Sequence, residues 1–589
     1  MIRDTIRRMI TAAAATLHER GELELPADGL PTFDVERPQQ AQHGDYATNL
    51  AMKLARPPKS REIATKIADY LNETAPLVPA YELVEHVETA GPGFINIRLS
   101  PKWLLRQAGA VIEAGPTVGN IELGVGKSID LEFVSANPTG PVHIGNGRGG
   151  FIGDTLGNLL RAAGYTVTKE YYFNDAGAQI QKLGRSIEYY LRLQLGQDVA
   201  KPKDEKGEIE GYFDDETDPE DTFYRGITRT IMAETHDGAD VLALPADERA
   251  AVIGKRAAGH VMRGIQATMA RLNIQFDVFF NEASLVTTGE LQAGIQTLRA
   301  AGYLYEREGA TWMETSRFGD DKDRVLLKSD GETTYAASDV AYIRNKLDRG
   351  FDQLIYVLGA DHHGYVGRLT AMAQMFGYAP DKIHVLIYQH VSLKVDGKSQ
   401  RMSKRKGNTI TLDELADLVG ADVMRFFYLS RSADTHLDFD LALAMKEGEE
   451  NPGLTVQYGH ARIAGVVRKS VEGGFHPEAE ALAADLAVLL ADAPEQLTAE
   501  LALIREVLRL EEIIERGALT LEPHHLTKYG MDVAAAFHIF YDRCPILRAE
   551  SDAVRGARFA LTLAARTVLA RVLTLLGMDA PDRMDRPTE

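Results

Sequence analysis

The sequence predicts an α/β protein: a doubly wound, Rossmann-like parallel sheet with an inserted domain, an α+β domain before it and an all-helical domain after it. Strand-like apolar runs alternate with helical patterns in the middle of the 589-residue chain, as in parallel sheets with crossover helices. Residues 178–280 interrupt that alternation and form the predicted insertion. From about residue 450 the chain is a succession of amphipathic helical patterns, which predicts a helical domain.

The first domain is predicted to span residues 1–112. Helical patterns alternate there with the apolar runs "ELVEHVETA" and "GFINIRL", which are typical of strands and meet at the turn "AGPGF". The opening stretch "MIRDTIRRMITAAAATLHERG" carries arginines, as a transit peptide does. Its Asp4 and Glu19 nevertheless favour an ordinary amphipathic helix.

The central domain is predicted to span residues 120–410. It begins with the strand "KSIDLEFV", a polar loop at 135–147, a helix at 148–163 and a second strand, "YTVTKEYY". After the insertion, the strands "QLIYVLGAD" and "KIHVLIY" lead to the basic loop "KSQRMSKRKGNTI". A connecting helical segment is predicted at 411–450, and the helical domain at 451–589.

Composition limits the class of protein. Hydrophobic residues make up 45% of the chain and charged residues 25%, which is an ordinary globular balance. The single cysteine, Cys544, excludes a disulfide framework and a cysteine-rich zinc site, and it suits a reducing cytoplasm. We see no apolar run near the roughly 20 residues that cross a bilayer, so no membrane partner is expected.

The net charge of −20 and the pI of about 5.3 argue against a non-specific nucleic-acid binder. We therefore expect no DNA partner, and we expect a monomer. Local basic segments remain compatible with this charge. The acidic run at 201–222, "KPKDEKGEIEGYFDDETDPEDT", is predicted to be a solvated surface insertion.

The segment "SANPTGPVHIGNGRGG" (135–150) contains the spacing G-x-G-x-x-G, which resembles a dinucleotide-binding fingerprint. In that fold the first glycine sits directly at the end of the first strand. Here a polar stretch separates Val134 from Gly145, which argues against a nicotinamide cofactor. A helix start with His143 and Asn146 beside it fits ATP better, and Gly145 and Gly147 let a nucleotide approach the backbone.

A second basic loop, "RMSKRKGN", follows the later strands and contains Arg401, Lys404, Arg405 and Lys406. Alone it is compatible with a solvated turn or part of a nucleic-acid track. Paired with the first loop, it places a phosphate-seeking element at each end of the sheet. Such a pair can clamp a triphosphate and stabilise the charge on departing pyrophosphate.

These two loops resemble the signatures of class I aminoacyl-tRNA synthetases: "HIGN" the His-Ile-Gly-His motif and "RMSKR" the Lys-Met-Ser-Lys-Ser motif. The segments "EYYFNDAG", "KSDGETTYAASDVAY", "GADHHGY" and "NPGLTVQYGHAR" are similar to arginyl-tRNA synthetases, and the resemblance covers nearly the whole chain. Two positions depart from the motifs, because Asn146 replaces the second histidine and Arg401 replaces the first lysine.

The resemblance implies a two-step reaction. Arginine and ATP, accompanied by Mg²⁺, give arginyl-adenylate and pyrophosphate. Arginine then passes to the 2′-hydroxyl of the terminal adenosine of tRNA(Arg), and tRNA is expected to be needed for the first step as well. His143, Asn146, Arg401 and Lys404 are the implied catalytic residues, with Lys404 holding the departing pyrophosphate.

The same resemblance assigns two substrate sites. The implied arginine-binding residues are Glu132, Ser135, Asn137, His143, Tyr335 and Asp339. The implied ATP-binding residues are Gly145, Asn146, Asp361, His362, Met402 and Lys404. A guanidinium offers five donors in a rigid fork, so carboxylates such as Asp339 suit it. No metal site is expected at the adjacent His362 and His363, because neighbouring side chains in such a loop point apart.

Both outer domains are implied to contact tRNA. Phe94 is expected to stack on a base and Asn96 to hydrogen-bond it, while Tyr458, His460 and Arg462 interleave aromatic and basic groups in the helical domain. Three alternatives stay open: another class I synthetase, for example for cysteine; a tRNA-binding paralogue without activity; and a dehydrogenase. The single cysteine argues against the first, the intact motif residues against the second, and the loop length against the third.

Overall fold

The computed structural model describes residues 1–584 except 216–221, 396–397, 401–409 and 449. Its centre is a five-stranded parallel sheet in the order β12-β11-β5-β6-β7. The strands are β5 (Ser128–Phe133), β6 (Thr166–Phe173), β7 (Val278–Asn281), β11 (Gln353–Gly359) and β12 (Ile383–Tyr388). Numbered along the chain, this order is 3-2-1-4-5, so the doubly wound sheet is confirmed, and its order reverses between β5 and β11.

The two faces of β5 differ in chemistry. Ile129, Leu131 and Phe133 point toward α5 (Ile144–Ala162), while Asp130 and Glu132 are buried on the other face toward α12 (Tyr335–Asp348). Alternation along a strand produces this split. A Cβ at Gly153 of α5 would lie 2.2 Å from the Phe133 ring, so a glycine there lets the helix lie close to the sheet.

The N-terminal domain is a four-stranded antiparallel sheet, β1-β2-β4-β3, covered by helices. Its elements are α1 (Ile2–Glu19), β1 (Val35–Glu36), β2 (Tyr46–Thr48), α2 (Leu50–Leu54), α3 (Lys59–Thr74), β3 (Val84–Ala90), β4 (Phe94–Leu99) and α4 (Pro101–Ala114). The two predicted strands correspond to β3 and β4, and α1 buries an apolar stripe, as its amphipathic pattern requires.

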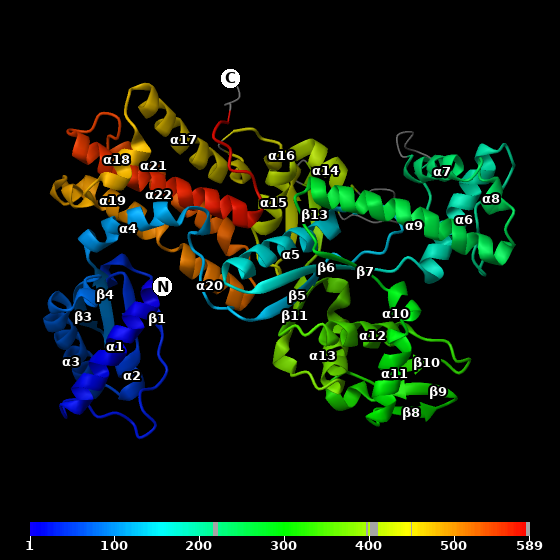
Figure 1. The fold of residues 1–589 in the computed structure, drawn as a ribbon, viewed down its shortest axis with the longest axis horizontal. Coiled ribbons are helices and arrows are strands. Elements are labelled where there is room, and N and C mark those ends of the chain that lie inside the picture. Colours follow the sequence, from blue (N-terminus) through cyan, green and yellow to red (C-terminus); the bar gives the residue numbers. More distant parts are fainter. Residues whose placement is uncertain (216–221, 396–397, 401–409, 449, 585–589) are drawn as a thin grey trace.

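The first insertion follows β6 in the sequence and ends before β7, which pairs with β6 in the sheet. It contains α6 (Gly177–Gln194), α7 (Phe223–Glu234), α8 (Ala239–Leu242) and α9 (Ala246–Arg271). They project to the right of the sheet in Figure 1. A second insertion was not expected from the sequence. It contains α10 (Ala283–Thr287), α11 (Glu290–Ala300) and an antiparallel sheet of β8 (Leu304–Arg307), β9 (Ala310–Met313) and β10 (Arg324–Leu327). Its short strands lack a clear period-2 pattern.

Beyond β12, short strands and helices join the sheet to the helical domain. These are β13 (Val391–Val395), β14 (Lys398–Gln400), α14 (Leu412–Val419), α15 (Ala421–Leu429), β15 (Leu437–Asp440) and α16 (Leu441–Ala444), whereas α13 (Val366–Met375) lies between β11 and β12. The connecting segment predicted to be helical, residues 411–450, also contains a strand, β15. This strand pairs with β13 in parallel.

The C-terminal region is helical, as expected. It contains α17 (Pro452–Glu472), α18 (Pro477–Ala483), α19 (Pro494–Val507), α20 (Leu510–Thr520), α21 (His525–Arg543) and α22 (Asp552–Leu576). Contrary to the sequence expectation, α22 is long and apolar enough by length and composition to cross a membrane. Within the described residues, 72% of its most apolar window is buried in the protein, which identifies it as the core helix of this domain.

Arg425 of α15 joins the helical domain to the sheet. Its guanidinium bonds Asp154 of α5 at 2.7 Å, and the other oxygen of Asp154 accepts from Lys169 of β6, also at 2.7 Å. Arg425 also donates to the carbonyls of Leu272 and Leu576, at 2.9 and 2.8 Å. All of these groups are buried, so one guanidinium connects α5, α9, α15 and the end of α22.

Replacing Arg425 with methionine is expected to lower the free energy of unfolding by about 3–5 kcal/mol, because a buried carboxylate loses one partner and buried carbonyls lose their donors. Denaturant unfolding followed by circular dichroism measures this. Arg317→Met is the control, since Arg317 pairs with Glu314 in solvent, where such pairs contribute little. An equal effect of the two substitutions would contradict the role assigned to Arg425.

Candidate active site

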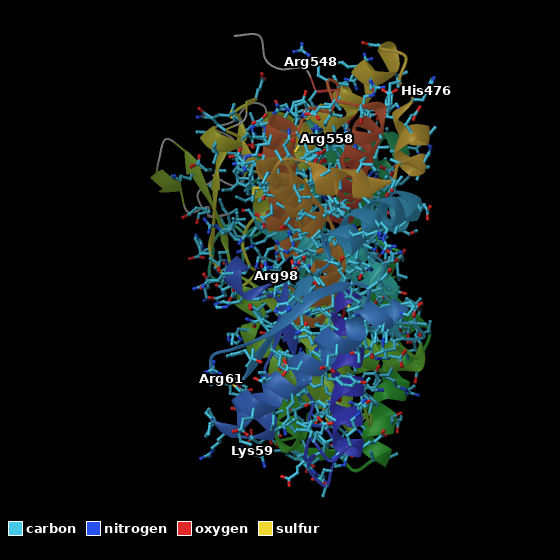
Figure 2. The ribbon with its side chains drawn as sticks, turned by 90° about the vertical axis from the view of Figure 1, so that its left-hand side faces the viewer. Lys59, Arg61, Arg98, His476, Arg548 and Arg558 are labelled. Carbon is cyan, nitrogen blue, oxygen red and sulfur yellow. The ribbon has the colours of Figure 1, made fainter. Side chains whose placement is uncertain are left out.

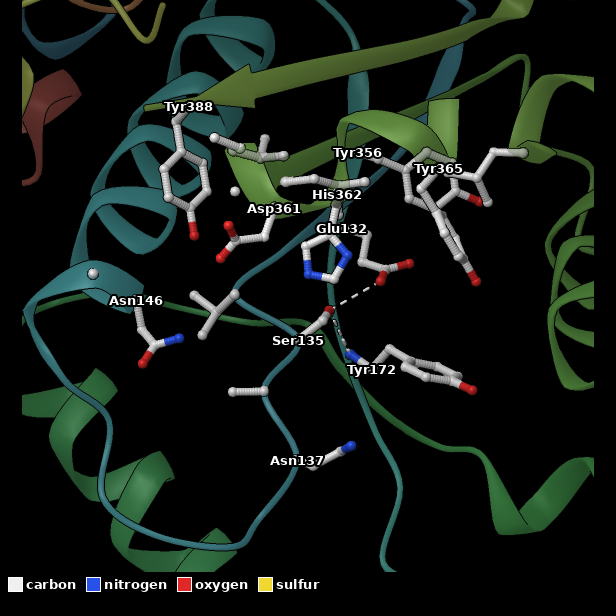
Figure 3. A pocket seen from close by; sticks show the side chains of 18 of the residues that line it. Glu132, Ser135, Asn137, Asn146, Tyr172, Tyr356, Asp361, His362, Tyr365 and Tyr388 are labelled. Carbon is white, nitrogen blue, oxygen red and sulfur yellow. Dashed lines mark hydrogen bonds between the residues drawn. The ribbon is translucent and has the colours of Figure 1, made fainter. Parts of the chain in front are cut away.

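A cavity of about 830 Å³ lies at the carboxyl ends of β5 and β11, where the strand order reverses. This is the position at which open α/β sheets bind ligands. Figure 3 shows Asn146 and Tyr388 on one side of the cavity and Tyr172 and Tyr365 on the other, with Ser135 between them. The cavity therefore has a mouth beside the start of α5 and an aromatic region beside α12.

The chain turns sharply as it leaves β5. Val134 and Ser135 have φ values of 66° and 42°, in the left-handed region that non-glycine residues rarely adopt. The Ser135 hydroxyl holds this turn: it donates to Glu132 Oε1 at 3.0 Å and accepts from the Tyr172 backbone N–H at 3.1 Å (Figure 3). A strained turn that the surrounding bonds fix in place is typical of a functional site.

The first motif forms a helix cap instead of a phosphate loop. His143 is the N-cap of α5; its Nδ1 accepts from the Gly145 N–H at 3.1 Å, and its own N–H donates to Asn146 Oδ1 at 3.1 Å. The helix thus begins at Ile144, earlier than predicted, because this reciprocal capping box satisfies its first donors. The amide group of Asn146 keeps its nitrogen toward the cavity (Figure 3).

The glycines of the motif serve different purposes. Gly145 lines the cavity, as expected for a residue beside ATP. Gly147 does not: a Cβ there would lie 2.6 Å from Leu412, so this glycine allows α5 to pack against the start of α14. The expectation that Gly147 contacts a nucleotide is wrong, because it lies inside the helix on a packed face.

The second motif falls at residues 401–409, outside the described residues, so the structure does not place Arg401, Met402 or Lys404. The chain that follows is placed. Ile144 N–H donates to the Ile410 carbonyl at 3.4 Å, and Leu412 N–H donates to the Val142 carbonyl at 3.0 Å. The segment after the second motif is therefore bonded to the backbone on either side of His143.

Helix α12 carries two of the predicted arginine-binding residues. Tyr335 and Asp339 are one turn apart and both line the cavity, and Tyr335 is 74% exposed. Asp339 Oδ2 has no hydrogen-bond partner among the residues that the structure describes. Burial raises the pKa of Asp339 to about 7, although a hydrogen bond from Tyr365 and the charge of Arg368, 3.9 Å away, oppose this shift.

Tyr342 and Lys346, about one and two turns beyond Asp339 on the same face of α12, contact the sheet. Lys346 Nζ lies 2.6 Å from Asp130 Oδ1 and 2.7 Å from Glu132 Oε2. The Tyr342 hydroxyl lies 3.0 Å from Glu132 Oε2 and 2.5 Å from Glu170 Oε1 of β6, so its single proton can be donated to either carboxylate. Three carboxyl groups of the sheet thus lie beneath the cavity, and α12 supplies donors to all of them.

Arg349 completes this cluster. Its guanidinium donates to both oxygens of Glu170, at 2.6 and 3.0 Å. Burial raises the pKa of Asp130 to about 6, with Lys346 opposing it. Burial acts in the same direction on Glu170, but Lys346 and Arg349 outweigh it and hold the pKa of Glu170 below its usual value. The cluster therefore keeps its charges only because they are paired.

Several predicted site residues are already engaged by the protein. Both oxygens of Glu132 accept bonds, from Ser135 on one side and from Tyr342 and Lys346 on the other. Asn137 donates to Gln179 at 3.1 Å and accepts from the Asn174 N–H at 3.0 Å. Both residues still line the cavity, and their contacts with arginine stay predictions.

Asp361 and His362 lie in the short helix Ala360–Tyr365 that follows β11, and both line the cavity. The Asp361 side chain is 84% exposed and lies 3.6 Å from His390. The His362 ring meets Tyr365 edge-on at 6.3 Å. Both residues can therefore meet a ligand in the cavity, and Figure 3 shows them between Asn146 on one side and Tyr365 on the other.

The cavity also contains residues that the sequence analysis missed. Glu282 follows β7 directly and accepts a hydrogen bond from Tyr172, while Tyr365 and Arg368 flank Asp339. Glu282 could have been found from the rule that strand ends meet at one edge, because β7 belongs to the same sheet. Arg368 carried no such signal, since its position depends on how α13 packs.

The predicted tRNA contacts lie far from this cavity along the chain. Phe94 is 40% exposed at the start of β4, whereas Asn96 is 3% exposed, and its amide nitrogen has no partner in the described part of the protein. In α17, Tyr458 donates to the Glu447 carbonyl and Arg462 is exposed beside His538. His460 is buried against the Pro581 carbonyl at 3.0 Å, so its predicted contact with tRNA is wrong.

Three family models match the chain in consecutive segments. The catalytic domain of the class I (R) tRNA synthetases matches residues 117–425. The arginyl-tRNA synthetase N-terminal domain matches residues 2–99, and the DALR anticodon-binding domain matches residues 456–584. The first match covers the sheet, both insertions and every described residue that lines the cavity.

Curated relatives agree with these matches. The chain is 42% identical to the arginine–tRNA ligase of Heliobacterium modesticaldum over 99% of both chains. It is 42% identical to that of Carboxydothermus hydrogenoformans over 95% of this chain and 96% of the relative. The solved arginyl-tRNA synthetase of Thermus thermophilus has the same fold, with a TM-score of 0.71 at 22% identity over 99% of this chain and all of the other. The chain belongs to the arginine–tRNA ligase family of class I tRNA synthetases.

Proposed function

We propose that this protein activates L-arginine with ATP and transfers it to the 2′-hydroxyl of the terminal adenosine of tRNA(Arg). The observation that carries this proposal is Asp339. Its buried Oδ2 has no hydrogen-bond partner in the described structure and lines a cavity that continues to the amino end of α5. One end of the cavity therefore suits a cationic side chain, and the other end suits a phosphate group.

The aromatic region of the cavity suits a guanidinium. Asp339 supplies a buried carboxylate, and Glu282 supplies a second at the end of β7. The rings of Tyr335 and Tyr365 can lie against the planar group, as aromatic faces do with arginine. Lysine carries a compact ammonium, which would leave part of this planar set of acceptors unpaired.

The mouth of the cavity suits ATP. The amino end of α5 attracts phosphate through its helix dipole, and the Asn146 amide nitrogen adds a donor there. The arginine carboxylate is ionised at neutral pH, so it attacks the α-phosphorus without a general base. Positioning and charge stabilisation must therefore supply the catalysis, with His143 holding the phosphate region.

Lys404 and Arg401 would stabilise the departing pyrophosphate. The described chain resumes at Ile410, six residues after Lys404, and the Ile410 carbonyl accepts from Ile144 N–H at the start of α5. Mg²⁺ would accompany ATP and be held mostly by phosphates and water. The exposed carboxylate of Asp361 at the mouth fits that use, since its ion-pair contact among the described residues is His390, 3.6 Å away.

The outer domains are proposed to hold tRNA. Figure 2 shows Lys59, Arg61 and Arg98 projecting from the N-terminal domain, with Arg548 and His476 projecting from the helical domain. Arg98 shares one face of β4 with Phe94 and Asn96, because side chains two apart on a strand point the same way. This face therefore combines an exposed cation for phosphate and an exposed ring for stacking, with the buried, unpaired Asn96 amide between them.

The reaction is tested by exchange of labelled pyrophosphate into ATP. We expect exchange with arginine in the presence of total tRNA, and much weaker exchange when tRNA is left out. Reactions with each of the other amino acids are the control. Exchange that depends on a different amino acid, or no exchange under any condition, would overturn the assignment.

The role of Asp339 is tested by Asp339→Ala. We expect the KM for arginine to rise about a hundredfold with the KM for ATP unchanged, because a buried charge partner of the guanidinium is lost. Asp348→Ala, on the exposed end of the same helix, is the matched control. Unchanged arginine kinetics in a folded Asp339→Ala variant would remove Asp339 from the pocket.

The raised pKa of Asp339 predicts how arginine binding depends on pH. Below pH 7 the carboxyl is protonated in the empty pocket, and the guanidinium must displace that proton to bind. The KM for arginine is therefore expected to rise about tenfold for each pH unit below 7 and to level off above it. Steady-state kinetics from pH 5.5 to 8.5 measure this, and Asp339→Asn should flatten the profile. A flat wild-type profile would contradict the prediction.

A further inference from the structure

Lys346 lies directly beneath the arginine-binding region and belongs to neither substrate site. Together with Tyr335, Asp339 and Tyr342 it forms one stripe along α12, at spacings of four, three and four residues. The first two members line the cavity, and the last two contact the sheet. The same helix face thus holds both the arginine-binding residues and their support.

The Lys346 side chain is 0% exposed, which is rare for lysine and requires strong compensation. Its ammonium contacts Asp130, Glu132 and, at 3.5 Å, Glu170. It also lies 4.7 and 4.5 Å from the ring centres of Tyr342 and Tyr356. These three acids outweigh the effect of burial, hold the pKa of Lys346 well above its usual value and keep the ammonium charged.

Glu132 is the acid through which Lys346 reaches the cavity. Without Lys346 and Tyr342, its Oε2 would be an unpaired carboxylate oxygen in a pocket that binds a cation. Such an oxygen attracts any positive group, whatever its shape, because Coulomb attraction has no directional preference. With both donors in place, Glu132 is occupied, whereas Asp339 Oδ2, with Arg368 3.9 Å away, has no hydrogen-bond partner among the described residues.

We propose that Lys346 is a positioning residue for substrate selection: by occupying Glu132 it prevents the pocket from binding a compact ammonium and directs the substrate's planar guanidinium to Asp339. This inference rests on the proposed function, because it concerns how the arginine site excludes lysine. Specificity of this kind depends on removing attraction for the wrong ligand as much as on binding the right one.

The test compares lysine, as a competitive inhibitor of the exchange reaction, with arginine as the substrate. In Lys346→Met, the ratio of the lysine Ki to the arginine KM is expected to fall at least about tenfold, as for one charge-assisted hydrogen bond, with the KM for ATP unchanged. Adding Glu132→Gln to that variant should restore most of the ratio, because it removes the unpaired carboxylate.

Lys169→Met is the matched control. Lys169 is a buried lysine of the same sheet, bonded to Asp154 and Asn158, but it faces α5 and lies outside the cavity lining. This variant is expected to lose stability and keep the wild-type ratio. If Lys346→Met does not fold, Tyr342→Phe frees part of Glu132 without burying a new charge, and the ratio should fall about threefold.

Two results would overturn the inference: a wild-type ratio in every variant of Lys346 and Tyr342 that folds, or the same loss of ratio in Lys169→Met. Failure of the proposed function has a different signature. In that case the wild-type protein itself shows no arginine-dependent exchange, and no ratio exists to compare.

Discussion

Three carboxyl groups buried under the cavity constrain the whole active site. Asp130, Glu132 and Glu170 lie on adjacent strands of the sheet and are buried on the face toward α12. Their charges are tolerable only with cations at bonding distance, and Lys346 and Arg349 both come from α12. The position of α12 is therefore set by charge pairing as well as by packing, and Tyr335 and Asp339 take their places above the cavity as a consequence.

A second constraint acts on the ATP side. The capping box between His143 and Asn146 starts α5 at the mouth of the cavity, and backbone bonds at Val142 and Ile144 hold the chain that follows the second motif. Asn146, which departs from the family motif, fits this arrangement. Its oxygen is used in the cap, and its nitrogen remains available to a ligand. A structural and a binding role thus share one side chain.

Buried charge also joins the domains. Arg425 links the sheet to the end of α22, and at the other end of the molecule Arg37 of the N-terminal domain donates to both oxygens of Glu512 in α20. These contacts hold the N-terminal domain against the helical domain, and the helical domain against the sheet. A tRNA that contacts either outer domain therefore meets a surface fixed relative to the cavity. Figure 1 shows the N-terminal domain below the left end of the helical domain, with the sheet and its insertions to the right.

The sequence by itself determined the alternation of strands and helices around the sheet, the first insertion and the helical C-terminal region, because these depend on local pattern, while motifs that resemble a family pointed to His143 and Asp339. Tertiary structure alone decided the rest. Glu132 was predicted to bind arginine, but Lys346, more than two hundred residues later, bonds to its carboxylate. Gly147 and His460 are packing positions. Such outcomes depend on which distant groups burial brings together, and local pattern contains no record of them.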